Sequence, residues 1–303
     1  MLKRTLVMLA LVLVGSASLA QYPVTDVFMV MLPEISDDAM SEAVMIAADD
    51  IMTIAANDHY DNQPSFTADG SGLLFVSEDE IESTNIYRYD MASGDITQLT
   101  DTVASEFSPR MTPDGQHISA VQIEPDGTTQ RLWRYELTGE NPTPVPEDVY
   151  RVGYYHYPNA DTVVMIVVAD SDDGLPLSLV ATDLTTGETE TIVPDVGVGV
   201  QKLPNYNAVS FVYRLEDGTS TIGIYDTDDG GHAAVADTLE GVDAHTWLPN
   251  GPLIAAQDNI IYRWDADAYD WTPFLDFSDT NITGINRLAA NPDGTALAFV
   301  VSR

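Results

Sequence analysis

The chain has 303 residues, 45% of them hydrophobic, and carries 48 acidic residues against 12 Lys and Arg. The hydrophobic content is typical of a globular protein and argues against disorder, while the lack of any cysteine excludes disulfides, thiolate metal ligands and a thiol nucleophile. Because the formal net charge is −36 at pH 7, we expect neither nucleic acid nor an anionic membrane surface as a partner.

Residues 1–20 have the features of a secretory signal peptide. Lys3 and Arg4 precede a short apolar run, and small residues lead up to Ala20. We expect cleavage after Ala20, a mature single domain at 21–303, and a periplasmic or secreted location. The alternative is an uncleaved anchor helix, which the shortness of the apolar run disfavours. No other long apolar segment follows, so we expect no membrane insertion.

Two segments after the signal peptide are predicted strands, Thr25–Met31 and Asp50–Ile54. Between them, Pro33–Ala48 is acidic and rich in Ala and Met. We expect this connection to be a long loop or a short helix.

The next feature is a repeat. The stretch DNQPSFTADGSGLLFVSE begins at residue 61, and EFSPRMTPDGQHISAVQI begins 45 positions later at residue 106. An Asp or Asn in the turn marks each unit, and these turn marks are Asp69, Asp114, Asn159, Asn205, Asn250 and Asp293. Their spacings of 45, 45, 46, 45 and 43 residues match the period of propeller blades.

Each unit contains the signals for four strands. Asp-Gly or Asn-Gly favours a tight turn between antiparallel strands because both residues tolerate positive φ. Short apolar runs such as Leu73–Val76 follow the turns, and alternating segments such as Ile86–Asp90 come next. A β-sandwich is the alternative, but it gives no reason for a fixed period. The predicted fold class is therefore all-β, a six-bladed β-propeller, with blades at about 61–100, 106–146, 152–193, 198–236, 243–275, and 285–303 plus 25–55.

The last blade is incomplete at the C-terminal end of the sequence. After Asp293 there is room for one strand only, Ala296–Ser302. The two N-terminal strands can supply the missing outer pair, which would close the ring and remove its exposed edges. We expect the N-terminal strands to join the C-terminal blade.

The motif Asn62-x-Pro64-x-Phe66-x-x-Asp69-Gly70, followed by Ile86-Tyr87 and Gln98-Leu99-Thr100, resembles the TolB-like propellers. These carry Pro-Asp-Gly relatives of the WD repeat. The likeness covers the chain after the signal peptide and is closest in the first two units. It implies six blades around a central channel, here without the N-terminal α/β domain of TolB.

Basic residues are so few that their positions are informative. Arg110, Lys202 and Arg287 fall in the predicted innermost strands of three blades. Together with His156 and His245, we expect them at the channel mouth, where they could bind an anion or a partner's carboxylates. The alternative is that each basic residue pairs with a neighbouring Asp.

A second hypothesis places chemistry in the channel. Six-bladed lactonase-type enzymes gather metal ligands from several blades, and the candidates here are Asp61, Asn62, Glu106, His156, Asp243 and His245. No His falls in an H-x-x-x-H or H-E-x-x-H spacing, and no G-x-S-x-G motif lies after the signal peptide.

The leading hypothesis is a non-enzymatic, exported scaffold that binds a protein or peptide partner. It needs no cofactor and no metal, and we expect a monomer. The acidic surface with few basic residues is similar to that of proteins from salt-loving organisms, so we expect low salt to destabilise the fold. The alternative function is a metal-dependent lactonase-type hydrolase.

Overall fold

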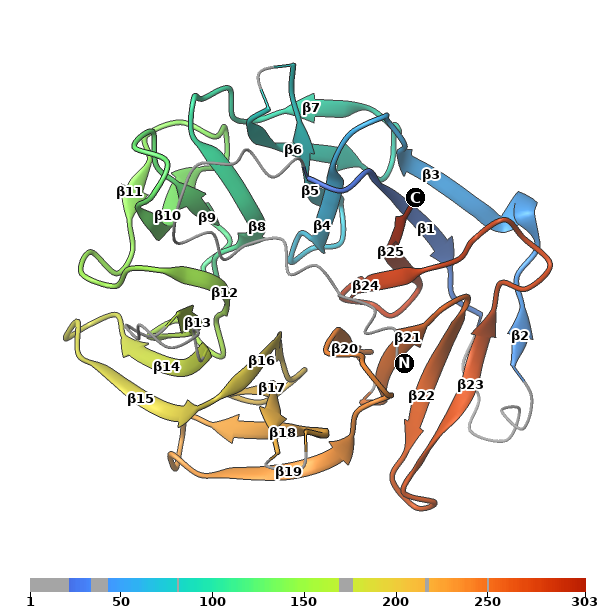
Figure 1. Ribbon diagram of the computed structural model, residues 1–303. Helices are drawn as coiled ribbons and strands as arrows, with labels where there is room; N and C mark the ends of the chain where they lie inside the picture. Colours follow the sequence, from blue (N-terminus) through green and yellow to red (C-terminus); the bar gives the residue numbers. More distant parts are fainter. Residues whose placement is uncertain (1–21, 34–42, 81, 169–176, 216–217, 250) are drawn as a thin grey trace, which may run out of the picture.

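The computed structural model describes residues 22–33, 43–80, 82–168, 177–215, 218–249 and 251–303. The predicted signal peptide therefore lies outside the described residues. In the described part of the chain, six sheets follow one another around a central axis (Figure 1). Five have four antiparallel strands, and the sheet of blade 5 has a short fifth strand added in parallel. This confirms the predicted six-bladed β-propeller. The described part contains no helix that is both long and apolar enough to cross a membrane.

The first three blades follow the chain in order, and each starts with the strand nearest the axis (Figure 1). Blade 1 contains β4 (Asp61–Phe66), β5 (Gly72–Glu78), β6 (Thr84–Asp90) and β7 (Ile96–Gln98). Blade 2 contains β8 (Ser105–Met111), β9 (His117–Ile123), β10 (Gln130–Glu136) and β11 (Thr143–Pro144). Blade 3 contains β12 (Val152–His156), β13 (Thr162–Val168), β14 (Leu177–Asp183) and β15 (Thr189–Pro194).

The remaining blades complete the ring. Blade 4 contains β16 (Val196–Lys202), β17 (Ala208–Arg214), β18 (Ser220–Asp226) and β19 (His232–Asp237). Blade 5 contains β20 (His245–Trp247), β21 (Leu253–Gln257), β22 (Ile260–Asp265) and β23 (Asp270–Asp276). Blade 6 contains β24 (Ile285–Ala290), β25 (Ala296–Ser302), β1 (Thr25–Met31) and β3 (Ile51–Ala55).

The repeated turn has a local cause. In blade 1, the Oδ1 atom of Asp69 accepts hydrogen bonds from the Thr67 hydroxyl at 2.7 Å and from the Ser71 amide at 3.0 Å. The next residue, Gly70, has a φ of 69°, a conformation that glycine adopts without strain. Equivalent carboxylates accept bonds from the Thr112 and Thr295 hydroxyls in blades 2 and 6. The turn is therefore held by side-chain hydrogen bonds as well as by glycine.

The ring closes between the two ends of the chain, as the sequence predicts. Strand β1 pairs antiparallel with β25 over seven positions, from Thr25↔Ser302 to Met31↔Ala296, and β3 pairs with the other side of β1. Val27 and Val300 face each other in this pairing, and both are fully buried. Arg303 adds charge contacts, donating from Nε to Asp26 at 2.7 Å.

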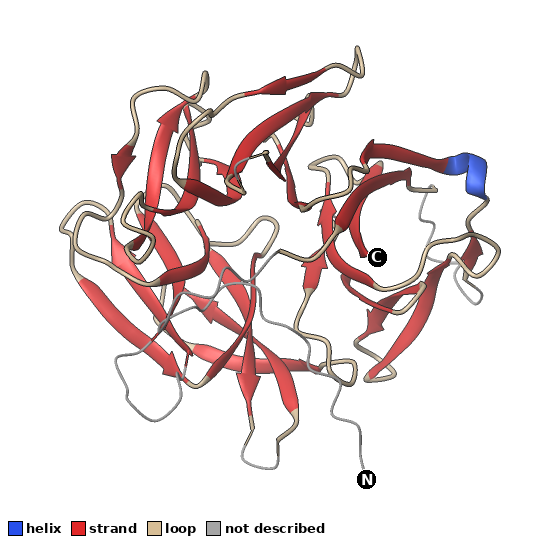
Figure 2. Ribbon diagram, turned by 45° about the horizontal axis from the view of Figure 1, so that its top comes forward, coloured by secondary structure: helices blue, strands red, loops and turns tan. Residues whose placement is uncertain are grey.

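The N-terminal segment also reaches blade 5, which the sequence does not predict. Strand β2 (Val44–Met45) pairs in parallel with the end of β23, and the Ile46 amide donates to Asp276 O at 2.9 Å. The following residues form one short 3₁₀ helix, η1 (Ala48–Asp50), the only helix drawn among the described residues (Figure 2). Ile46 is buried in the cluster of apolar side chains between blades 5 and 6. The expected loop therefore contains a fifth strand for blade 5.

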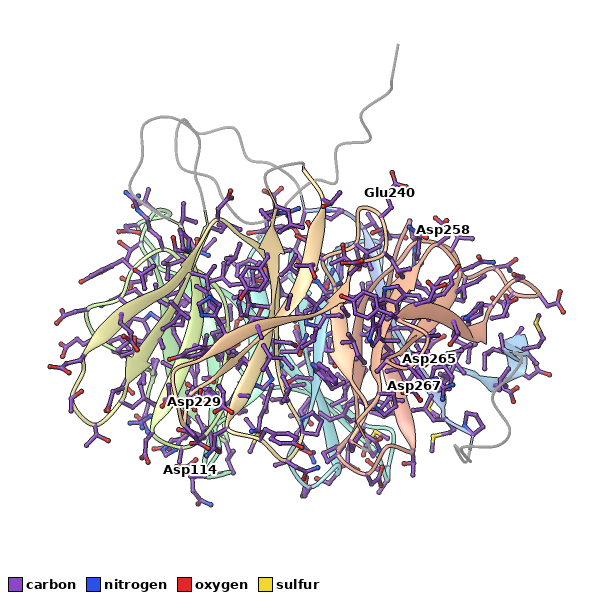
Figure 3. The ribbon with its side chains drawn as sticks, turned by 90° about the horizontal axis from the view of Figure 1, so that it is seen from below. Asp114, Asp229, Glu240, Asp258, Asp265 and Asp267 are labelled. Atoms are coloured by element: carbon purple, nitrogen blue, oxygen red, sulfur yellow. The ribbon has the colours of Figure 1, made fainter. Side chains whose placement is uncertain are left out.

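Acidic side chains lie on both faces of the ring. Figure 3 shows it edge-on, with Asp114 and Asp229 at one face and Glu240 and Asp258 at the other. The cores, in contrast, lie between adjacent blades and are apolar. Negative charge is therefore concentrated on the surface, whereas the few basic residues of the predicted site lie near the axis.

Candidate anion-binding site in the channel

All five predicted site residues lie on the innermost strands, and His245 begins β20. Arg110 is on β8, His156 ends β12, Lys202 ends β16 and Arg287 is on β24. These strands surround the axis of the ring (Figure 1). Arg110, His156 and Lys202 each lie three or four residues before their turn mark, so they approach the same face of the ring.

Arg110 and His156 join blades 2 and 3. The Nη1 atom of Arg110 lies 3.1 Å from Nε2 of His156, and the Tyr157 amide donates to Nδ1 of the same ring at 3.0 Å. Burial, followed by the charges of Arg110 and Lys202, holds the pKa of His156 well below its usual value. The imidazole is therefore neutral at pH 7 and has one acceptor nitrogen only. Both Arg110 and the Tyr157 amide approach the ring as donors, so in one of these two contacts an N–H of the imidazole faces another N–H.

Arg287 and Tyr154 meet across the axis. They belong to blades 6 and 3, which face each other on opposite sides of the ring (Figure 1). The Nη2 atom of Arg287 donates to the Tyr154 hydroxyl at 3.2 Å, and its guanidinium carbon lies 5.4 Å from the centre of the Tyr154 ring. Such a contact combines a hydrogen bond with cation–π attraction. We call this pair the channel bridge.

Lys202 is held at the edge of the same region. Its Nζ donates to Pro158 O at 2.5 Å and to Tyr206 O at 3.0 Å. The first contact links blade 4 to blade 3. Two of the three N–H groups are thus bound by carbonyl oxygens, and burial lowers the pKa of the lysine. Lys202 contributes positive charge near His156 while its position is fixed.

No carboxylate neutralises this group among the residues that the structure describes. Four other arginines form ion pairs, and these are Arg88–Asp90, Arg131–Glu124, Arg214–Asp243 and Arg303 with Asp26 and Asp58. Arg110, Lys202 and Arg287 form none. The Nε atom of Arg110 is buried without a hydrogen-bond partner, and burial lowers the pKa of this arginine, an effect to which the charge on Arg287 adds. Within this part of the chain, Arg110, Lys202 and Arg287 therefore do not pair with a neighbouring Asp, whereas Arg88, Arg214 and Arg303 do.

A group of aromatic rings is buried in the packing near Arg287. Tyr60, which precedes β4, packs against Tyr22 with 5.2 Å between ring centroids, and both lie near Phe107. Burial raises the pKa of Tyr60, although the charge on Arg287 acts against this. The sequence analysis did not single out Tyr60. No motif marks this residue, since it lies just before the first repeat.

The structure does not bring His245 to this group. Its Nε2 lies 2.8 Å from the Ser210 hydroxyl, and its Nδ1 lies 3.1 Å from Asp243 O. Trp247 also donates to Ser210, at 2.8 Å. In the same way, Ser119 joins Tyr155 between blades 2 and 3 at 2.9 Å. Both serines lie five residues after a turn mark, a spacing from which this inter-blade contact could have been found.

The carboxylates considered as metal ligands are engaged elsewhere. Asp61 accepts bonds from the Asn57 amide at 2.9 Å and from the Ser77 hydroxyl at 2.6 Å. Glu106 accepts bonds from Thr102 at 2.8 Å and from Gln122 at 3.1 Å, and its burial raises its pKa. In the described residues, no three His, Asp or Glu side chains are grouped so that they could hold a metal ion.

Comparison with known proteins identifies solved structures with a similar fold. No family model and no curated protein matches the chain. Among solved structures, a putative TolB from Agrobacterium tumefaciens has a TM-score of 0.66 at 15% identity, with 93% of this chain and 99% of that chain covered. TolB from Acinetobacter baumannii has a TM-score of 0.56 at 15% identity, covering 84% and 57% respectively.

A described gluconolactonase from Xanthomonas campestris, XC5397, is also similar, with a TM-score of 0.56 at 12% identity, covering 80% of this chain and 86% of that one. Identities this low establish the fold alone. The chain has the fold of the six-bladed β-propellers. Within that class, its fold is similar to that of the two TolB structures.

Proposed function

We propose that this protein is an exported, non-enzymatic scaffold that binds an acidic segment of a protein or peptide partner at the mouth of its channel. Arg110, His156, Lys202 and Arg287 supply the positive charge for the contact. His245 acts in the packing between blades 4 and 5.

One observation carries the proposal: Arg110 and Arg287 approach the axis without a carboxylate partner among the described residues. The described part of the chain is rich in Asp and Glu, yet none of these carboxylates forms an ion pair with either arginine. Both arginines are half-buried, and a charge that is partly withdrawn from water without a counter-charge is destabilising. A ligand that supplies the missing negative charge would recover this cost on binding.

The location and assembly state belong to the proposal. The sequence features of residues 1–20 support export through a cleaved signal peptide. We propose a monomer in solution, because the ring closes within one chain. Mass spectrometry of the exported protein tests the first point, since a mature chain beginning at Gln21 is expected. Light scattering tests the second.

The lactonase hypothesis has support from the fold likeness to XC5397 only. Metal analysis of the purified protein separates the two functions. One tightly held divalent ion per chain, together with lactone hydrolysis that Asp61→Asn abolishes, would favour the enzyme over the scaffold.

Peptide binding tests the scaffold directly. Fluorescence anisotropy would compare labelled Glu-rich peptides with their Gln counterparts, on the wild type, Arg110→Gln and Arg287→Gln. Arg88→Gln is a matched control, because it removes the same charge from the third strand of blade 1, where Arg88 pairs with Asp90. We expect each channel variant to weaken binding by about 30-fold or more, as for the loss of one member of a buried charge pair. Equal affinities in all four proteins would refute the proposal.

A further inference from the structure

The channel bridge prevents a chain from passing through the ring. Arg287 and Tyr154 come from opposite blades and are joined by a 3.2 Å hydrogen bond and a cation–π contact. Any extended peptide that threaded along the axis would have to separate them. A ligand that leaves the bridge in place must stop there, so it must enter end-on or be small.

The groups beside the bridge are donors. Arg110 has a buried Nε–H without a partner, and its neighbour His156 has a contact in which two donors face each other. The Tyr154 hydroxyl accepts from Arg287, and its own proton has no acceptor among the contacts of the described residues. A group that only accepts hydrogen bonds, and that carries negative charge, would satisfy these donors together.

Carboxylate is the chemical group that fits best. It offers two oxygens with about four acceptor positions, and it matches the planar fork of a guanidinium. A phosphate dianion also accepts from arginine, but it carries about twice the charge through the field of a protein with a net charge of −36. The acidic surface therefore favours a singly charged ligand.

We propose that Arg110, Arg287 and Tyr154 form a closed-end site for one terminal carboxylate, the C-terminal α-carboxylate of a peptide that enters end-on from the face where the turn marks lie. This inference rests on the proposed scaffold function and specifies the group that the channel recognises. Lys202, fixed at the edge of the site by Pro158 O and Tyr206 O, adds attraction at the entrance.

Calorimetry with a matched set of ligands tests the site. The set contains N-acetylated tripeptides of alanine with a free C-terminus, the same peptides as C-terminal amides, peptide amides with an internal Glu, N-acetylalanine, and inorganic phosphate. In about 0.15 M NaCl, where the Debye length is about 8 Å, the free acid should bind about 30-fold more tightly than the amide, or about 2 kcal/mol.

The same titrations on variants locate the carboxylate. Arg110→Gln and Arg287→Gln should each remove the preference for the free acid, and Arg88→Gln should keep it. Tyr154→Phe retains the ring beside Arg287 but loses the donated proton, and an affinity loss of about 10-fold is expected. Because Tyr154→Phe is nearly isosteric, it remains informative if an arginine variant fails to fold.

The outcomes are separable. Peptide amides with internal Glu that bind as well as free acids would overturn the closed-end site while leaving the scaffold intact. Binding of N-acetylalanine without any peptide binding would support the carboxylate site and overturn the scaffold. Tighter binding of phosphate than of every carboxylate, or an unchanged free-acid preference in both Arg110→Gln and Arg287→Gln, would overturn the inference.

Discussion

The charged groups in the turns and the basic residues near the axis differ in how well the fold compensates their charge. At the turns, one carboxylate receives several donors: Asp69 Oδ1 accepts from Thr67, from the Ser71 amide and from the Ser71 hydroxyl within 3.0 Å. At the centre, the described contacts leave the Arg110 Nε without any acceptor. The turn carboxylates are satisfied within the fold and serve its stability. The central cations have no carboxylate partner among the described residues and are therefore suited to an anionic ligand.

The largest expected effect concerns the acidic surface as a whole. Salt should stabilise the protein, because the Debye length falls from about 30 Å at 0.01 M to about 3 Å at 1 M and the carboxylates then repel one another less. We expect the melting temperature to rise by about 10 °C over this range, which is about 3–4 kcal/mol for a chain of this size. Calorimetry in NaCl measures it, and a flat profile would show that the surface charge has no such role.

The second prediction removes a central charge. Arg110→Met should raise the free energy of unfolding of the unliganded protein by about 1–3 kcal/mol, because it removes a buried donor, the Arg110 Nε, that has no acceptor. Urea unfolding measures the change. A destabilised Arg110→Met protein that still folds would mean that Arg110 serves the structure and not a ligand.

The third prediction removes a turn charge and has the opposite sign. Asp69→Ala should lower the free energy of unfolding by about 1 kcal/mol, because the donors on Thr67 and Ser71 lose their acceptor. Asp267→Ala, at another exposed turn, is the comparison, since its carboxylate accepts no described hydrogen bond. If Asp69→Ala and Arg110→Met shift stability in the same direction, the contrast between turns and centre fails.

The smallest effect concerns pH. Hydrogen bonds from Thr67 and Ser71 lower the pKa of Asp69 to about 2, and bonds from Thr129 and Thr128 lower that of Asp126 to about 2. Because these folded-state values lie below the ordinary value of 3.8, the stabilisation is present above about pH 4 and is lost as the pH falls toward 2. Protonation also relieves surface repulsion, so the melting temperature should be followed in about 1 M NaCl, where repulsion is screened. Asp69→Asn should flatten the slope.

The sequence predicts most of the fold because each repeat unit is defined by short local patterns of turn residues and apolar residues. The six turn marks and the apolar strands after them depend on neighbours in the chain, and the pairing of β1 with β25 follows from a count of strands. Strand β2 could not be predicted in the same way. It has two residues and a parallel partner in another blade, so no local period marks it.

The site was predicted less completely. The positions of Arg110, Lys202 and Arg287 on innermost strands follow from their distance to the turn marks. The channel bridge does not, because Arg287 and Tyr154 are 133 positions apart and meet only once the ring is closed. His245 shows the opposite difficulty: it lies on an innermost strand, but its side chain turns into the packing against Ser210.

Because the two ends of the chain pair in blade 6, the closed ring does not depend on which blade comes first in the sequence. The Arg303 amide donates to Val24 O at 3.1 Å, so residues from opposite ends of the sequence are in contact. A short linker could join them, and new termini could be opened at an exposed turn such as Gly127. The permuted protein would retain the same strand pairs in space and would start its synthesis at another blade.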